Sequence, residues 1–288
     1  SADLGVTIRE DSRGIREGRG SGELFFPSFT YPKLSARYRL ETLNFEEKSE
    51  KENCRVVSAC FQYSLNHRNE VAFTFSPEAY SGRKDINAYD FHGLTGTDNL
   101  HLSFNGGRTG FKENIQVMRS SLAEDYATLT MFGELNPRAR ISQSFTAADL
   151  DDGNSRRRFD TDLLYFLTRR GVPLLSISGR LSQVSYESQK DRQGNPLMYW
   201  APSDFRGIQL KVGWERGVGS RWWYGWEVHG DSNSFREATP ETTNENGFGF
   251  TVHASYRFET GRFHGRFSDT IHGYYRERLL GAFASLDF

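Results

Sequence analysis

Apolar and polar residues alternate along most of the chain with a period of two. In residues 247–260, the side chains of Phe248, Phe250 and Val252 are apolar, and those of the intervening Thr251 and His253 are polar. Successive side chains of a β-strand point to opposite faces of the sheet. The pattern therefore predicts a strand with one apolar face and one polar face.

The same alternation, broken by turn residues, predicts sixteen strands joined as consecutive antiparallel hairpins. We place them near residues 2–10, 22–32, 35–47, 54–66, 69–78, 98–106, 111–118, 124–135, 138–148, 157–168, 172–187, 204–216, 221–234, 247–260, 262–275 and 279–288. No convincing helical stripe competes with this pattern. The whole chain, residues 1–288, is expected to form a single all-β domain, an antiparallel β-barrel.

Short and longer connections alternate between the predicted strands. The short ones include Asn136-Pro137 and a link from Gly106 to Gly110, whereas the longer ones are expected at 11–21, 79–97, 149–156, 188–203 and 235–246. Bacterial outer-membrane barrels have short periplasmic turns and longer outer loops. An even number of strands places both termini on the periplasmic side, which is the side of the short links.

The composition resembles that of a soluble protein but also fits a transmembrane barrel. Only 36% of the residues are hydrophobic. A membrane barrel needs an apolar side chain only at every second position, so its average hydropathy is low. Trp214, Trp222 and Phe263 are expected to belong to an interfacial aromatic girdle, and the terminal Phe288 resembles an outer-membrane assembly signal.

A soluble β-sandwich or a lipocalin-like barrel would show the same alternation. The predicted strands are roughly 10–15 residues long, which is enough to cross a bilayer. This length and the unbroken series of hairpins favour a transmembrane barrel in a bacterial outer membrane.

If the apolar face meets lipid, the polar face lines the lumen and carries the candidate functional residues. These are Arg37, Arg39, Glu134, Arg138, Arg140, Asp160, Asp162, Phe166, Arg180, Lys211, Glu215, Trp223, Glu227, Arg257, Glu259 and Arg266. The two signs of charge nearly balance, so neither a strongly anionic polymer nor a nucleic acid is indicated as a partner. Opposed charges are expected to pair across strands.

Large aromatic rings are also expected to point into the lumen, at Phe26, Tyr126, Phe132, Phe166, Trp223, Tyr274 and Phe283. A water-filled lumen gains nothing from such rings. Sugar rings offer C–H faces that stack on aromatic side chains, so a saccharide ligand would benefit from them. Alternatively, the rings fill space and stiffen the wall.

No pattern indicates a cofactor, a metal site or an enzyme. His229, Ser232 and Asn233 are similar to the His/Ser/Asn set of outer-membrane phospholipases, but they lie too close in sequence to converge readily. An enzyme of that type is therefore the least favoured alternative. Cys54 and Cys60 lie too far apart on one predicted strand to form a disulfide.

The C-terminal third resembles a known family. A segment that begins at Tyr199, YWAPSDF, precedes a predicted strand, and the segments GWER, WYGWE and SFRE follow at 213–216, 223–227 and 234–237. This order is similar to the barrel domains of exopolysaccharide secretion proteins, which include the cellulose-synthase outer-membrane subunit, the poly-N-acetylglucosamine exporter and the Pel exporter. The resemblance covers residues 197–288 and extends to the rest of the chain only through the strand count.

This resemblance implies a pore that passes a growing polysaccharide from the periplasm to the cell exterior. The implied partners are the polysaccharide, outer-membrane lipid, a periplasmic tetratricopeptide-repeat scaffold and an inner-membrane synthase. Family members usually carry that scaffold before the barrel, so this chain is either the barrel portion alone or departs from the family. A passive porin for oligosaccharides or ions would show much the same pattern and remains an alternative.

The outer loops at 79–97, 188–203 and 235–246 are expected to narrow the exit of the pore. A barrel of this size leaves an aqueous channel unless something fills it. Tyr199 and Trp200 are unusually apolar for a loop tip, and the barrel mouth could cover them. We therefore expect Tyr199, Trp200 and Asp204 to form a loop gate.

Overall fold

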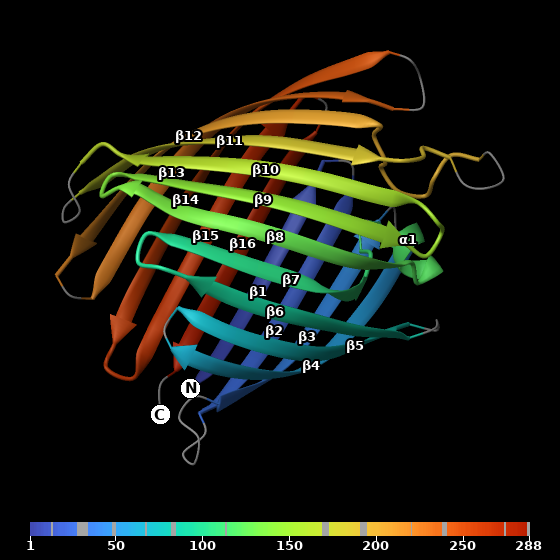
Figure 1. Ribbon diagram of the computed structural model, residues 1–288. Coiled ribbons are helices and arrows are strands. Elements are labelled where there is room, and N and C mark those ends of the chain that lie inside the picture. The colour runs from blue at the N-terminus through green and yellow to red at the C-terminus, as the bar shows by residue number, and fades with distance from the viewer. Residues whose placement is uncertain are drawn as a thin grey trace.

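The computed structural model is a closed antiparallel barrel of sixteen strands (Figure 1). The structure describes residues 1–12, 14–27, 34–47, 50–66, 68–81, 85–112, 114–168, 173–190, 195–219, 221–237, 241–273 and 275–286. Each strand pairs with its neighbour along the chain, and β1 (Ala2–Asp11) pairs with β16 (Arg276–Leu286) to close the sheet. Closure leaves no unpaired sheet edge, which a β-structure needs in order to cross a bilayer.

The remaining strands follow the chain in order. They are β2 (Ile15–Pro27), β3 (Leu34–Glu47), β4 (Glu50–Asn66), β5 (Asn69–Tyr80), β6 (Ile86–Gly96), β7 (Leu100–Gly110), β8 (Ala123–Asn136), β9 (Ala139–Leu150), β10 (Ser155–Phe166), β11 (Leu174–Tyr186), β12 (Asp204–Val218), β13 (Trp222–Arg236), β14 (Thr242–Phe258) and β15 (Gly261–His272). One helix, α1 (Ile115–Ser120), lies between β7 and β8 in the described part of the chain.

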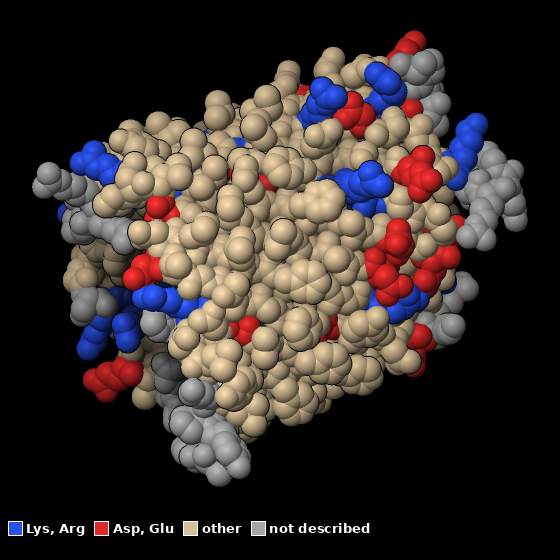
Figure 2. Space-filling model, viewed as in Figure 1, with Lys and Arg blue, Asp and Glu red and all other residues tan. Residues whose placement is uncertain are grey.

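The strands present their apolar side chains on the outside of the barrel. On β14, Phe248 and Val252 are 59% and 43% exposed, whereas Thr251 and Ser255 on the inner face are buried. Figure 2 shows a broad belt with very few charged residues across the middle of the visible outer wall, with most charged side chains gathered towards the two ends. Such a belt matches a hydrocarbon layer between two polar interfaces.

The described helix is too short to cross a membrane, and no other described segment forms a long apolar helix.

The two ends of the barrel differ. Both termini lie at one end, and α1 lies at the other (Figure 1). The two longest connections, 111–122 and 187–203, are both at the end that carries α1. Because outer loops are longer than periplasmic turns, we call this the outer end and the end with the termini the periplasmic end.

Two of the predicted segments are wrong, although the total of sixteen strands is right. Residues 79–97, expected as an outer loop, contain β6, which pairs with both β5 and β7. Residues 111–118, expected as a strand, contain the start of α1. The alternation of β6 is weak because its outer face carries only two large apolar residues, Tyr89 and Phe91.

Other expected connections are shorter than predicted. Most of 11–21 belongs to β2, whose outward positions 18, 20 and 22 are glycines and so lack an apolar signal. The expected link from Gly106 to Gly110 lies within β7. The loop expected at 235–246 shrinks because β13 and β14 extend to Arg236 and from Thr242. Cys54 and Cys60 are both free.

Candidate functional site

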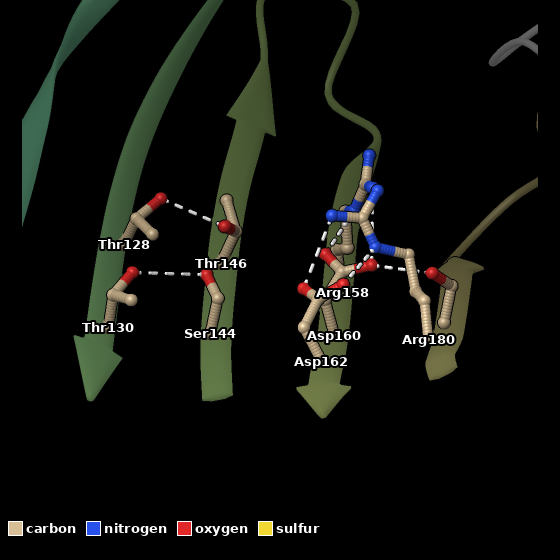
Figure 3. A network of polar contacts seen from close by, with 9 residues as sticks. Thr128, Thr130, Ser144, Thr146, Arg158, Asp160, Asp162 and Arg180 are labelled. Atoms are coloured by element: carbon tan, nitrogen blue, oxygen red, sulfur yellow. Dashed lines mark hydrogen bonds and ion pairs between the residues drawn. The ribbon is translucent and has the colours of Figure 1, made fainter. Parts of the chain in front are cut away.

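One wall of the lumen presents short hydroxyl side chains. On the inner faces of β8 and β9, the Thr128 and Thr146 hydroxyls lie 2.8 Å apart and hydrogen-bond, and the Thr130 hydroxyl donates to Ser144 at 3.3 Å (Figure 3). A hydroxyl can both donate and accept. This wall can therefore exchange hydrogen bonds with water or with a hydroxylated ligand, and it carries no charge in the middle of β8 and β9.

The charged residues beside this wall pair with one another. Arg158 Nε donates to Asp160 Oδ2 at 2.6 Å, and Arg180 Nε donates to Asp162 Oδ1 at 2.6 Å (Figure 3). Ser182 also donates to Asp160, at 2.6 Å. Because each of these arginines lies against a carboxylate, the group adds little net charge to the lumen.

Four more of the predicted lumen charges are paired. Arg140 donates to Glu134 at 2.9 Å, and its guanidinium lies 5.4 Å from the centre of the Phe166 ring. Arg39 lies 2.9 Å from Glu41, and Arg37 lies 3.9 Å from Glu23. The Arg140–Glu134 and Arg37–Glu23 contacts tie neighbouring strands together, and all three contacts leave the paired side chains only partly available to a ligand.

A second group of predicted lumen residues has no such partner. Lys211, Glu227, Arg257 and Arg266 lie on the inner faces of β12–β15 and make no ion pair with another described residue. Trp223, on the same wall, is 48% exposed. Glu215 lies 3.4 Å from His253 Nε2, its one ion-pair partner among the described residues. In the part of the chain that the structure describes, the wall formed by β12–β15 therefore keeps several charges available.

Several predicted positions lie elsewhere. Arg138 and Glu259 are exposed in turns at the periplasmic end rather than on the inner face of a strand. Phe26 faces outwards and is 56% exposed, because it pairs with Ala36 on the lipid face. Its neighbour Phe25 faces the lumen, with the Arg37 guanidinium 5.5 Å from its ring centre. Tyr274 and Phe288 lie outside the described residues.

The outer mouth contains α1, a feature that the strand pattern did not predict. Met118 and Val117 are fully buried. Met118 packs against Leu43, Phe45 and other residues on the inner faces of β3–β6. Because these side chains face the barrel interior, α1 lies inside the mouth. Asn114 is the residue from which the start of this helix could have been predicted, because asparagine is a preferred helix N-cap. Its side chain accepts a hydrogen bond from Val117 N at 2.9 Å and caps the helix.

Ion pairs hold the helix segment against the wall. Arg119 pairs with Glu50 and lies 3.6 Å from Glu52 on β4. Lys112 lies 2.9 Å from Glu78 on β5. The segment is therefore fixed to the wall by charge as well as by apolar packing.

The 187–203 connection covers this segment. The ring of Tyr199 packs edge-on against Phe111, with 5.3 Å between the ring centres. Its hydroxyl donates to Asp152 at 2.8 Å and accepts from Asn154 at 3.0 Å. Burial raises the pKa of this hydroxyl, and the contact with the Asp152 carboxylate acts in the same direction, although the hydrogen bond from Asn154 lowers it. Asn114 Nδ2 also donates to the Met198 carbonyl, at 2.7 Å.

Trp200 lies beside Tyr199 but contacts the next part of the rim, formed by β12 and β13. Its ring packs edge-on against Phe205 and Phe235, at 5.4 and 5.5 Å between ring centres. Both phenylalanines belong to the inner faces of β12 and β13. Its Nε1 donates to Glu237 at 3.0 Å. Asp204 does not join this group, because it starts β12 on the outward face and pairs with Arg206 at 3.1 Å.

The segments that occupy the outer mouth therefore differ from those expected for the loop gate. Tyr199 and Trp200 lie at the mouth, but 79–97 and 235–246 do not supply loops of the expected length. The 111–122 segment takes their place. A gating role for any of these residues remains a prediction.

The phospholipase-like residues do not come together. His229 and Asn233 face the lumen, whereas Ser232 pairs with Ile208 on the outward face of β13. A serine nucleophile needs a base within hydrogen-bond reach. These three residues cannot provide that arrangement on one strand.

No protein-family model matches the chain. No curated protein matches it either.

Solved structures show the fold. The chain is similar to a structure described as "Bacterial polysaccharide outer membrane secretin", with a TM-score of 0.79 and 9% identity over 100% of this chain and 98% of the other. It is also similar to OccK10 (OpdN) of Pseudomonas aeruginosa, with a TM-score of 0.55 and 11% identity over 100% and 98% of the two chains.

A third similar structure is a loop-deletion mutant of OmpT, an outer membrane protein of Vibrio cholerae. Its TM-score is 0.52 at 8% identity, over 98% of this chain and 97% of the other. At such identities the likeness shows an outer-membrane β-barrel fold, and this fold points to a bacterial outer membrane.

Proposed function

We propose that this barrel is an outer-membrane pore that exports a polysaccharide from the periplasm to the cell exterior. The observation that carries the proposal is the neutral, hydroxyl-lined wall of β8 and β9 next to charges that neutralise one another (Figure 3). A polysaccharide presents hydroxyl groups on every ring. It can exchange hydrogen bonds with such a wall without being held at one strong site.

The aromatic residues of the lumen support the same function. Trp223 is 48% exposed on the inner face of β13 and offers a ring face to the C–H faces of sugars, whereas Phe166 is buried, with the Arg140 guanidinium 5.4 Å from its ring centre. The likeness to the structure described as a polysaccharide outer membrane secretin is also greater, by TM-score, than the likeness to the OccK10 barrel. Both structures are distant in sequence, so the lumen chemistry is the stronger support.

The occupied outer mouth favours export over passive diffusion. A porin for oligosaccharides or ions, the alternative function, needs a mouth that stays open. Here α1 and the 187–203 connection pack against each other through buried residues that include Val117 and Tyr199. These contacts are non-covalent, so a polymer that arrives from the periplasmic end can displace them. On this proposal, the periplasmic scaffold and the inner-membrane synthase deliver the polymer to the periplasmic end.

Deletion of the gene in its own host tests the proposal. Loss of surface polysaccharide, with polymer retained in the periplasm and export restored by the wild-type gene, is the expected result. Unchanged surface polysaccharide would refute export. Planar-bilayer recording separates the alternative: a porin would show a large open conductance in the wild type, whereas the exporter should show a small one.

A further inference from the structure

A recess of about 1020 Å³ opens at the periplasmic end of the lumen. Arg221, Arg257 and Arg262 lie on one side of it, with Trp223 and Phe283 nearby. The recess lies at the end where the chain termini meet, which is the entrance for a polymer that comes from the periplasm (Figure 1). It is separate from the hydroxyl-lined wall of β8 and β9.

The three arginines lie at directly adjacent positions on neighbouring strands. Arg257 is paired with Arg262 in the β14–β15 register, and Arg257 N donates to the Arg221 carbonyl at 2.8 Å. Like charges directly opposite one another destabilise a sheet. By contrast, the lumen arginines Arg158 and Arg180 each have a carboxylate partner.

No such partner reaches these arginines. Among the described residues, none of the three makes an ion pair, and Arg262 makes only a hydrogen bond to Ser255 at 3.3 Å. The acidic residues of the recess are Asp3 and Glu23. The register places Ser285 between Arg262 and Asp3, so the backbones of Arg262 and Asp3 are two strands apart, roughly 10 Å at the usual strand spacing.

The two aromatic rings are held in place by glycines. A Cβ atom at Gly5 would lie 2.8 Å from the Phe283 ring, and one at Gly217 would lie 3.1 Å from the Trp223 ring. Each ring therefore lies directly over the backbone of a neighbouring strand. Phe283 and Trp223 are still 42% and 48% exposed, so their free faces are open to the recess.

We propose that this recess is an entrance site for a polysaccharide whose sugars carry carboxylates, such as a uronate polymer. The inference rests on the proposed export function and names its substrate class. The planar guanidinium group matches a carboxylate with two parallel hydrogen bonds. A bound carboxylate relieves the repulsion between Arg257 and Arg262, while Trp223 or Phe283 stacks on the sugar ring.

The near balance of charge along the whole lumen is consistent with such a substrate. Most of the charges neutralise one another locally, so the balance does not describe the field at the entrance. Among the described residues, unpaired arginines lie directly opposite one another only there. An anionic chain is thus captured at the entrance and then meets the neutral wall of β8 and β9, where it can slide.

Oligosaccharide block of single channels tests this site. The folded full chain is inserted in planar bilayers. Hexamers of galacturonate, of glucose (maltohexaose, called the maltose hexamer below) and of glucosamine are added in turn to the periplasmic side. If the native mouth passes too little current, the measurement is made with residues 187–203 shortened. We expect the galacturonate hexamer to block at a concentration about tenfold lower than the maltose hexamer at low salt, because hydrogen bonds to charged groups are the stronger ones. High salt should reduce this preference.

Arg262→Gln and Arg257→Gln should each raise the half-blocking concentration of the galacturonate hexamer by about tenfold. Lys211→Gln is the matched control, since it also removes one unpaired lumen cation but lies outside the recess. It should change the value by less than about twofold. Heat-dependent gel mobility shows that each variant is folded.

The outcomes separate the two proposals. Equal block by all three hexamers, or preferred block by the glucosamine hexamer, would overturn the carboxylate site and leave export intact. An equal effect of Lys211→Gln and Arg262→Gln would also overturn it, because only the general field would then matter. If no hexamer blocks the wild-type channel, the saccharide pathway itself is refuted.

Discussion

The outward face of β12 provides a direct test of the barrel's orientation in lipid. Leu210 lies near the middle of this strand, is 63% exposed, and pairs with Gly179 and Gly230 on the two neighbouring strands. An arginine at this position would therefore have no carboxylate directly beside it. We predict that Leu210→Arg strongly destabilises the folded barrel.

The size of the effect follows from the depth of the residue. An arginine on the lipid face near the bilayer midplane costs about 2–4 kcal/mol. Since 1.4 kcal/mol corresponds to a factor of ten, the ratio of folded to unfolded protein should fall by a factor between about 30 and about 700.

Gln209→Arg is the matched control. Gln209 faces the lumen and pairs with Arg180 on β11 and Asp231 on β13, so a new cation there has water and a carboxylate nearby. We expect a change in unfolding free energy of less than about 1 kcal/mol. Urea unfolding in lipid vesicles, with gel mobility as a second readout, measures both variants. Equal destabilisation of the two variants would show that the inner and outer faces have been assigned incorrectly.

Three further predictions concern the outer mouth. Met118→Asp places a charge in the apolar cluster around α1 and should release the helix, so that the single-channel conductance rises several-fold, whereas an unchanged conductance would show that α1 does not restrict the pore. Asn154→Ala removes the side-chain amide that donates to the Ser188 carbonyl and to Tyr199, each at 3.0 Å, and should expose 187–203 to proteolysis at a cost of about 1–3 kcal/mol; wild-type resistance would contradict this role. The pKa of Tyr199 is raised in the docked state, so docking is fully stable below the ordinary tyrosine pKa of about 10 and weakens as the pH rises above it. Conductance should rise in that range in the wild type but not in Tyr199→Phe, and the same rise in both would exclude this hydroxyl as the cause.

The inner and outer faces were the most predictable feature, because the alternation of residues records them directly. Trp223 and Phe166 lie on the inner faces of their strands, as the phase of each strand indicated. Errors arose where the outer face lacks large apolar residues. Three glycines hid the start of β2, and β6 followed a charged stretch that suggested a loop.

The helix at the mouth was harder to predict for a different reason. Phe111, Ile115 and Val117 are apolar at odd positions, as on a strand, and this hid the helix cap at Asn114. Val117 and Met118 are both buried because the segment is covered on two sides, by the barrel wall and by the 187–203 connection. A period of two records only one covered face, so it cannot reveal a segment packed inside the barrel.

Charge pairing depends on contacts that the linear sequence does not contain. Arg9 donates to Glu277 at 2.6 Å across the β1–β16 closure, although the two residues are 268 positions apart. Paired and unpaired arginines cannot be told apart in the sequence, because both occupy polar, inward-facing positions in strands whose apolar and polar residues alternate. Only the register shows that Arg180 has the Asp162 carboxylate opposite and that Arg257 has another arginine opposite.

The difference between unpaired arginines at the entrance and paired arginines such as Arg180 determines where the proposed pathway binds an anionic polymer most strongly. An anionic polymer gains most from the unpaired arginines at the periplasmic entrance and less from the neutral wall above them, so the entrance recruits the chain but does not drive it outwards. On the proposed export function, the movement would then come from extension of the polymer by a synthase. At the outer mouth, the polymer has to displace contacts that are individually weak, such as the hydrogen bond from Tyr199 to Asp152, worth about 0.5–1.5 kcal/mol. On the proposed export function, a mouth closed in this way should open when a chain pushes against it and close again behind the chain, and the pore should conduct little in the absence of polymer.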